Sequence, residues 1–204
     1  MKRYGWLFNL LALVLFSAVC AKDNSGTNGN GTSNGWGSFP VPIYAGPSLT
    51  ASSTAQSDLQ DAIGFWETRA GRKLFNYQGA LPADTQAYSG TPDSPGTVQN
   101  NFIELMNPWP YAQNIAGLTT VERSGSQIDA AVVMINNSIV LCPGDCPGSA
   151  ATSQRKTFTH ELGHFLGLPH VQDTSNIMYP QIQLGGSLSD VTIDEPALQE
   201  LTSN

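Results

Sequence analysis

The sequence predicts a single α+β domain. Two segments have helical periodicity, several others have the composition of strands, and a length of 204 residues suits one hydrophobic core. Only 12% of the residues are charged, whereas 40% are hydrophobic. Because the hydrophobic residues are unevenly distributed, the N-terminal part of the chain has to be separated before elements are assigned.

The N-terminus has the layout of a secretory signal. Lys2 and Arg3 precede an apolar stretch that ends in small residues, and a segment rich in Gly, Ser, Asn and Thr follows. We therefore predict a signal peptide over residues 1–21, a flexible linker over residues 22–38 and a folded domain over residues 39–204. A retained membrane anchor is disfavoured, because a bilayer core needs about 20 apolar residues and this stretch is short and interrupted.

Two routes of processing stay open at the end of the signal. Ser17-Ala18-Val19-Cys20 resembles a bacterial lipobox, in which the cysteine becomes lipidated, and the linker would then tether the domain to a membrane surface. An ordinary signal peptidase site is the alternative. We expect either a cell-surface lipoprotein anchored through Cys20 or a freely secreted extracellular protein, with no membrane contact beyond the lipid.

Charge and cysteine content restrict the partners further. The chain has 9 Lys and Arg against 16 Asp and Glu, which disfavours binding to phosphate backbones and predicts no nucleic-acid partner. Cys142 and Cys146 flank a Pro-Gly-Asp turn that brings the two sulfurs together. In an oxidising compartment this arrangement favours a small disulfide loop, and a second metal site is the alternative.

Two amphipathic helices and four strands are expected in the folded domain. The first helix runs from Ser53 to a stop at Gly71 with Trp66 on its apolar stripe, and the second runs from an N-cap at Ser153 to Leu166. We interpret residues 76–99 as a long surface loop. The strand candidates are residues 39–44, whose prolines suit a sheet edge, and residues 101–106, 115–121 and 128–141.

All three histidines of the chain fall within eleven residues, as His160-Glu-Leu-Gly-His164 followed by His170. His160 and His164 are one helical turn apart and share a face of the second helix. In a continuing helix His170 would point about 240° away from His164 around the axis, so the chain must leave the helix, and Gly167 permits that turn.

The composition of this motif predicts a catalytic zinc site. Three neutral imidazoles occupy three corners of a tetrahedron and leave the fourth to water. Zinc acidifies such a water, and Glu161 can act as the base that takes its proton. The sequence therefore indicates hydrolysis, with one Zn²⁺ held by His160, His164 and His170.

These residues resemble those of the metzincins, and Ser175-Asn-Ile-Met178-Tyr-Pro180 resembles the methionine turn of the matrixin branch. The resemblance implies a metzincin-like zincin domain: a twisted, mostly parallel sheet with an antiparallel edge strand, two long helices and a small C-terminal subdomain with a final helix near residues 193–201. It also implies that Met178 lies beneath the metal as a hydrophobic floor.

The same resemblance implies a substrate-binding surface. The strand at residues 130–135, with Ala130 and Val132, would be the sheet edge along which a peptide lies extended. Pro180 and Ile182 would wall the pocket for the side chain that follows the cut bond. Binding of Ca²⁺ through acids and carbonyls stays open.

The sequence thus predicts a zinc-dependent endopeptidase that hydrolyses protein or peptide substrates and is monomeric. One alternative is a surface binding or adhesion module on a metzincin scaffold with little turnover, although Glu161 argues against it. The other is a metal-dependent hydrolase that acts on something other than protein.

Overall fold

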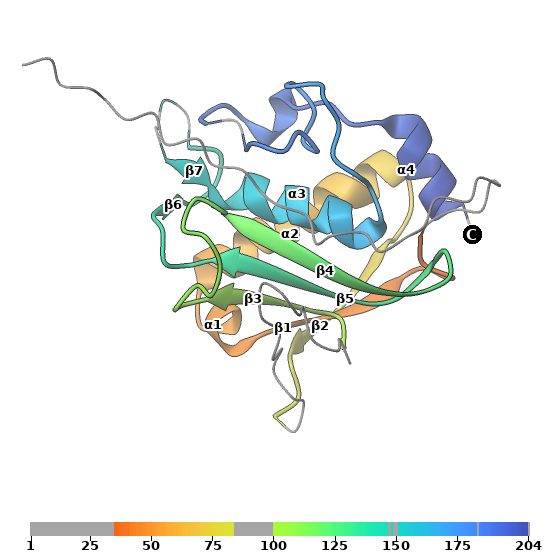
Figure 1. The fold of residues 1–204 in the computed structure, drawn as a ribbon, viewed down its shortest axis with the longest axis horizontal. Helices are drawn as coiled ribbons and strands as arrows, with labels where there is room; N and C mark the ends of the chain where they lie inside the picture. The colour runs from red at the N-terminus through yellow and green to blue at the C-terminus, as the bar shows by residue number, and fades with distance from the viewer. Residues whose placement is uncertain (1–34, 84–99, 147, 149–150, 183, 204) are drawn as a thin grey trace, which may run out of the picture.

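The computed structural model describes residues 35–83, 100–146, 148, 151–182 and 184–203. Two long helices pack on one side of a five-stranded sheet, and a smaller C-terminal part follows the second of them (Figure 1). The elements in chain order are β1 (Val41–Ala45), α1 (Pro47–Thr50), α2 (Ser53–Ala70), β2 (Phe75–Ala80), β3 (Phe102–Met106), β4 (Gly117–Ser124), β5 (Gln127–Asn136), β6 (Leu141–Cys142), β7 (Thr152–Ser153), α3 (Gln154–Leu166), a 3₁₀ turn (Leu188–Asp190) and α4 (Glu195–Thr202).

The sheet is mostly parallel, with one antiparallel edge strand. Its order is β2-β1-β3-β5-β4, and only the β4–β5 pair is antiparallel. This confirms the predicted α+β class with a mixed sheet. Figure 1 shows β4 as the strand that runs beside α3, so the sheet edge faces the helix that carries the histidines.

The prediction that residues 39–44 form an edge strand is wrong, because β1 lies between β2 and β3. Pro42 is tolerated inside the sheet for a local reason. Pairing between β1 and β3 begins only at Tyr44, two residues after Pro42. The amide of Tyr44 donates a hydrogen bond of 2.9 Å to the carbonyl of Asn101, just before β3. The N–H that Pro42 lacks would therefore have no partner in β3.

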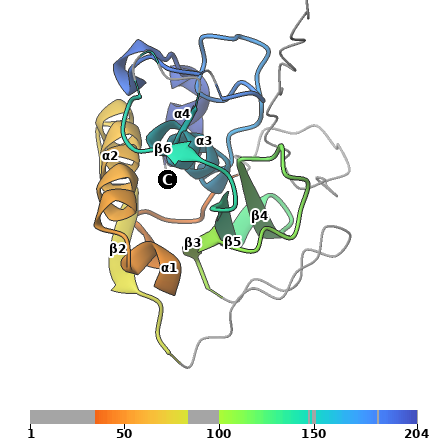
Figure 2. The same cartoon turned by 90° about the vertical axis from the view of Figure 1, so that its left-hand side faces the viewer.

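The two long helices begin and end where the sequence indicates. Ser52 caps α2 by accepting a hydrogen bond from the amide of Ala55, and Gly71 ends it in the left-handed region at φ 66°. Figure 2 shows α2 and α3 side by side on the same face of the sheet. The indole of Trp66 in α2 donates a hydrogen bond of 2.8 Å to the carbonyl of Thr159 in α3, which fixes the two helices together.

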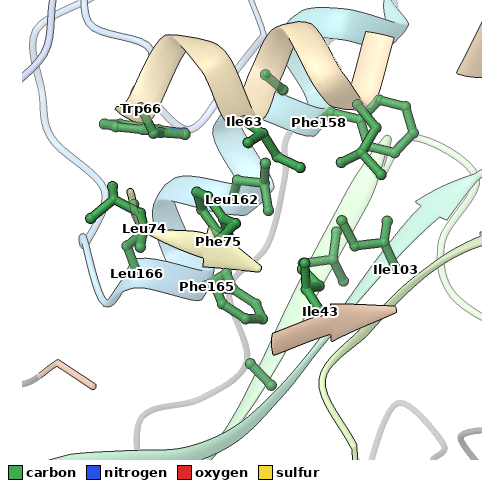
Figure 3. Close-up of a cluster of buried hydrophobic side chains, with 14 of the residues drawn as sticks. Ile43, Ile63, Trp66, Leu74, Phe75, Ile103, Phe158, Leu162, Phe165 and Leu166 are labelled. Carbon is green, nitrogen blue, oxygen red and sulfur yellow. The ribbon is translucent and has the colours of Figure 1, made fainter. Parts of the chain in front are cut away.

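The main core lies between these helices and the sheet (Figure 3). It is apolar because each contributing strand and helix turns one stripe toward it. Its fully buried large side chains include Ile43, Leu59, Trp66, Leu74, Ile103, Ile135, Phe158, Leu162 and Phe165. A second, smaller cluster on the sheet's other face contains Phe102, Trp109, Leu118, Ala130, Val132 and Met134.

Two expected boundaries need correction. The segment read as a loop over residues 76–99 begins with β2, because Phe75 to Ala80 pairs in parallel with β1, and residues 84–99 lie outside the described part. The predicted linker over residues 22–38 also extends too far. Trp36 is buried, stacks on Phe165 at 4.9 Å between ring centroids, and donates an indole hydrogen bond of 2.8 Å to the Phe165 carbonyl.

The predicted signal peptide and Cys20 lie outside the described residues. Within the described part, no helix combines the length and the apolar character that a bilayer-spanning segment needs. The structure joins Cys142 and Cys146 in a disulfide whose Cα atoms are 6.0 Å apart.

We expect Trp36→Ala to lower the free energy of unfolding by about 3–5 kcal/mol, because it removes a buried aromatic ring that packs against Phe165 near the end of α3. Trp36→Phe should cost less, since it keeps most of the ring packing and loses only the bond to the Phe165 carbonyl. Urea denaturation of the three proteins measures both effects. Unfolding of Trp36→Ala at the wild-type midpoint would show that residues 35–38 do not belong to the folded domain.

Candidate active site

The helix that presents the first two histidines is defined at both ends by local interactions. The Ser153 hydroxyl caps α3 by accepting from the Lys156 amide at 3.1 Å. At the other end Gly167 has φ 106°, and its amide and that of Leu168 bond to the carbonyls of His164 and Gly163. The chain therefore leaves the helix at Gly167 as predicted, because a side chain at that φ would be strained.

This turn brings the third histidine back to the first two. The Nε2 atoms lie 3.1 Å apart for His160 and His164, and 3.2 Å from each of these to His170. These are the only described residues that form a group of three potential metal ligands. Tetrahedral zinc with imidazole ligands at about 2.0–2.1 Å separates the nitrogens by roughly 3.3 Å. The triangle of ring nitrogens therefore fits zinc.

Backbone carbonyls set the protonation of two of the rings. The Nδ1 of His160 is 2.6 Å from the Ile177 carbonyl, and the Nδ1 of His164 is 2.8 Å from the Leu168 carbonyl. A carbonyl can only accept, so each Nδ1 carries the proton and each Nε2 presents a lone pair to the centre of the triangle. Converging lone pairs repel one another unless a cation lies between them.

Burial favours the neutral rings that a metal needs. Loss of hydration is the main cause that lowers the pKa of His160 to about 4 and that of His164 well below its ordinary value. Burial also lowers the pKa of His170, which is more exposed. All three side chains are therefore neutral at physiological pH, which is the form that binds a metal.

Glu161 lies beside this triangle in a dry environment. Its side chain is almost fully buried, and one carboxylate oxygen, Oε2, accepts a hydrogen bond of 2.7 Å from the hydroxyl of Thr119. The other, Oε1, has no partner among the described residues. Burial raises the pKa of Glu161 to about 8, against the opposing effect of the Thr119 hydrogen bond. A buried carboxylate with one oriented and one free oxygen is suited to proton transfer.

Gly117 leaves the space that Glu161 occupies. A Cβ atom at Gly117, the first residue of β4, would lie 2.7 Å from Oε1 and 2.9 Å from Cδ of Glu161. The hydroxyl oxygen of Thr119, two residues along the same strand, lies 2.7 Å from Oε2 and 3.0 Å from the backbone carbonyl of Glu161, and its single hydrogen is shared between these two acceptors. The edge strand thus sets the position of the carboxylate from two points.

Met178 packs against the helix between the first two ligands. A Cβ atom at Gly163 would clash with Sδ of Met178 and with the ring of Trp66, so only glycine permits this approach. The turn is held by the Asn176 side chain, which accepts from the Met178 amide at 2.9 Å, and by a bond of 3.1 Å from the Val171 amide to the Met178 carbonyl. The methionine turn therefore orients His160 through Ile177 and supports α3 through Met178.

The strand at residues 130–135 is not the sheet edge, which corrects the edge position expected for Ala130 and Val132. Val132 pairs with Thr120 on one side and Phe102 on the other, and Ala130 pairs with Glu122 of β4. An extended peptide has no access to a strand that is paired on both sides. The edge strand beside the histidines is β4.

Pro180 and Ile182 follow the methionine turn, where Pro180 is partly exposed and Ile182 is buried. Gly117, Thr119 and the packing role of Gly163 were not predicted from the sequence. A signal existed for Gly117, because a glycine inside a strand candidate marks a close approach of other atoms. Nothing in the local sequence points to Thr119.

Comparison with known proteins agrees with this geometry. The family model for matrixin matches residues 66–201, which include β4, α3, the three histidines and the methionine turn. A search of curated proteins found no significant match. The match covers most of the chain and includes every residue of the metal triangle, and matrixins are zinc-dependent metallopeptidases. The chain therefore belongs to the matrixin family.

Proposed function

We propose that the protein is an exported, zinc-dependent endopeptidase that cleaves peptide bonds of protein substrates. The observation that carries the proposal is the convergence of three Nε2 atoms within 3.2 Å of one another beside the free Oε1 of Glu161. His160, His164 and His170 would hold the zinc, and Met178 would lie beneath it. A site with three protein ligands leaves one position for water or substrate, which is typical of catalytic rather than structural zinc.

In the proposed reaction the protein supplies orientation and proton transfer. When bound, zinc acidifies a water molecule and polarises the carbonyl of the peptide bond. Glu161 takes a proton from the attacking water through Oε1 and passes it to the nitrogen of the departing amine. Thr119 holds Oε2, so that the free oxygen keeps a fixed direction.

The substrate is proposed to lie along β4. This strand is last in the sheet order, and two of its residues, Gly117 and Thr119, contact Glu161 directly. A peptide that adds to this edge would be held through its backbone and would pass the catalytic carboxylate. Pro180 and Ile182, from the segment after the methionine turn, are proposed to wall the pocket for the side chain after the cut bond.

Export is proposed from the N-terminal sequence and is supported by the Cys142–Cys146 disulfide, since such bonds persist in oxidising compartments. Lipidation at Cys20 and free secretion remain the two proposed forms. Mass spectrometry of the mature N-terminus distinguishes a diacylglyceryl cysteine from an unmodified residue.

Glu161→Gln should reduce kcat by roughly 100- to 10,000-fold, because it removes the proton acceptor and keeps the shape of the side chain. Zinc content should stay near one ion per chain, since Glu161 is not a ligand. Casein cleavage and elemental analysis measure the two quantities, with exposed Glu200→Gln as the matched control. Wild-type rates in Glu161→Gln would falsify the proposed mechanism.

Removal of zinc should lower the unfolding temperature of the wild-type protein and abolish cleavage. At free zinc a thousandfold above the Kd, binding to the folded state contributes about 4 kcal/mol. His170→Ala should already unfold at the lower temperature, and a chelator should shift it no further. Calorimetry with and without chelator tests this, and a chelator shift of equal size in both proteins would exclude His170 as a ligand.

Gly117→Ala should lower kcat by on the order of 100-fold, because the added methyl group displaces the Glu161 carboxylate by about 1 Å. Zinc binding should be unaffected, since the three atoms nearest to a Cβ atom at Gly117 all belong to Glu161, which is not a proposed ligand. Gly64→Ala is the control, because a Cβ atom there has open space in the middle of α2. Equal activity of the two variants would mean that β4 does not position the base.

The alternatives to a peptidase predict different activities. Peptide-library cleavage followed by mass spectrometry, run beside simple ester substrates, separates a peptidase from a hydrolase with other substrates. Zinc-loaded protein that cleaves no polypeptide would overturn the proposal in favour of a binding module or a non-peptide hydrolase.

A further inference from the structure

The segment over residues 185–190 is held by two side chains from distant parts of the chain. It follows Ile182, so it continues the chain that is proposed to wall the substrate pocket. Asp145 comes from the disulfide loop between β6 and β7, and Lys156 comes from the first turns of α3. Neither residue contributes to the zinc site described above.

Asp145 binds the segment at two points. Its Oδ1 accepts a hydrogen bond of 3.1 Å from the amide of Leu188, and its Oδ2 accepts one of 3.0 Å from the hydroxyl of Ser187. Arg155 of α3 also contacts Oδ1 at 3.3 Å. Because the carboxylate accepts hydrogen bonds from a backbone amide and a hydroxyl at the same time, it fixes both the position and the orientation of the turn that starts at Ser187.

The disulfide loop that carries Asp145 is itself anchored to the core helices. The amide of Gly144 donates to both carboxylate oxygens of Asp58, a buried residue of α2, at 3.1 Å each. The hydroxyl of Ser153, the cap of α3, donates to the carbonyl of Gly144 at 2.6 Å. Because these bonds and the Cys142–Cys146 bridge fix the loop backbone, Asp145 is a rigid attachment point.

Lys156 holds the other end of the segment. The residue is 3% exposed, and its ammonium group donates to the carbonyl of Gly185. Lysine is almost never buried unless it is paired, because an unpaired ammonium loses its hydration. Lys156 lies one helical turn before His160, so the same helix that presents the first metal ligand also binds the segment.

We propose that Asp145 and Lys156 are positioning residues that determine which side chains the enzyme accepts after the cut bond. Pro180 and Ile182 lie between two anchored points, the methionine turn at Met178 and the turn at residues 185–188 that Lys156 and Asp145 hold. Loss of the second anchor frees the wall that contains Ile182 and leaves the zinc triangle intact. This inference rests on the proposed peptidase function.

Hydrogen exchange tests the anchor without any need for activity. In Asp145→Ala the amide of Leu188 loses its acceptor, and its exchange should accelerate roughly tenfold or more relative to wild type. Asp145→Asn should show a smaller effect, because the amide oxygen can still accept from Leu188. Lys156→Met should accelerate exchange in the same segment. Protection unchanged in Asp145→Ala and Lys156→Met would overturn the proposed anchor.

Cleavage of a peptide library varied at the residue after the cut bond tests the specificity. Wild type should prefer a restricted set of side chains. In Asp145→Ala and Lys156→Met the ratio of kcat/KM between preferred and disfavoured peptides should fall roughly three- to tenfold, mainly through KM. A merely destabilised protein would instead lose kcat equally for all peptides. Equal losses across the library, or an unchanged preference, would overturn the specificity role.

Asp61→Asn is the matched control, because Asp61 also pairs with Arg155, at 2.7 Å, and forms no hydrogen bond or ion pair with residues 185–190. It should keep both the protection and the preference of wild type. Replacing Cys142 and Cys146 together by serine should reproduce the Asp145→Ala pattern in weaker form, since it loosens the loop and keeps the carboxylate. Wild-type protein that cleaves no peptide would overturn the proposed function and the specificity role together, while the exchange result decides the anchor separately.

Discussion

The arrangement of the site depends on three imidazole lone pairs that meet in a mostly buried place. Two rings are fixed by helical spacing and the third returns through the left-handed turn at Gly167. Backbone carbonyls of Leu168 and Ile177 hold the protons of His164 and His160 on the outer nitrogens. The rings are therefore oriented for a cation in its absence. The surrounding fold holds them in place against the repulsion between their lone pairs.

Packing on both sides of α3 keeps the histidine rings in this arrangement. Trp66 and Phe165 join the helix to α2 and to Trp36, and Met178 fills the space left by Gly163. Ligand positions inside a packed core shift little, because neighbouring side chains have no free volume to move into. The positions of the three histidines consequently depend on the packing of the hydrophobic core.

Burial affects the pKa of Glu161 and the pKa values of the histidines in opposite directions. Burial keeps the histidines neutral, which suits metal binding, and it also raises the pKa of Glu161, because burial disfavours the charged form of either kind of side chain. Only the hydroxyl of Thr119 opposes this second effect, and it does so at one oxygen. A single buried environment thus surrounds both the proposed ligands and the proposed base.

The sequence by itself determined the helices, the convergence of the three histidines, the turn at Gly167 and the α+β class, because each follows from spacing over a few neighbouring residues. It misplaced the sheet edge and the start of the domain, and it missed Thr119 and the anchors of residues 185–190. Those features depend on which strand pairs beside which and on contacts such as Trp36 with Phe165, between residues far apart in the chain. Only the tertiary structure decides them, since local periodicity carries no information on the order of strands in a sheet.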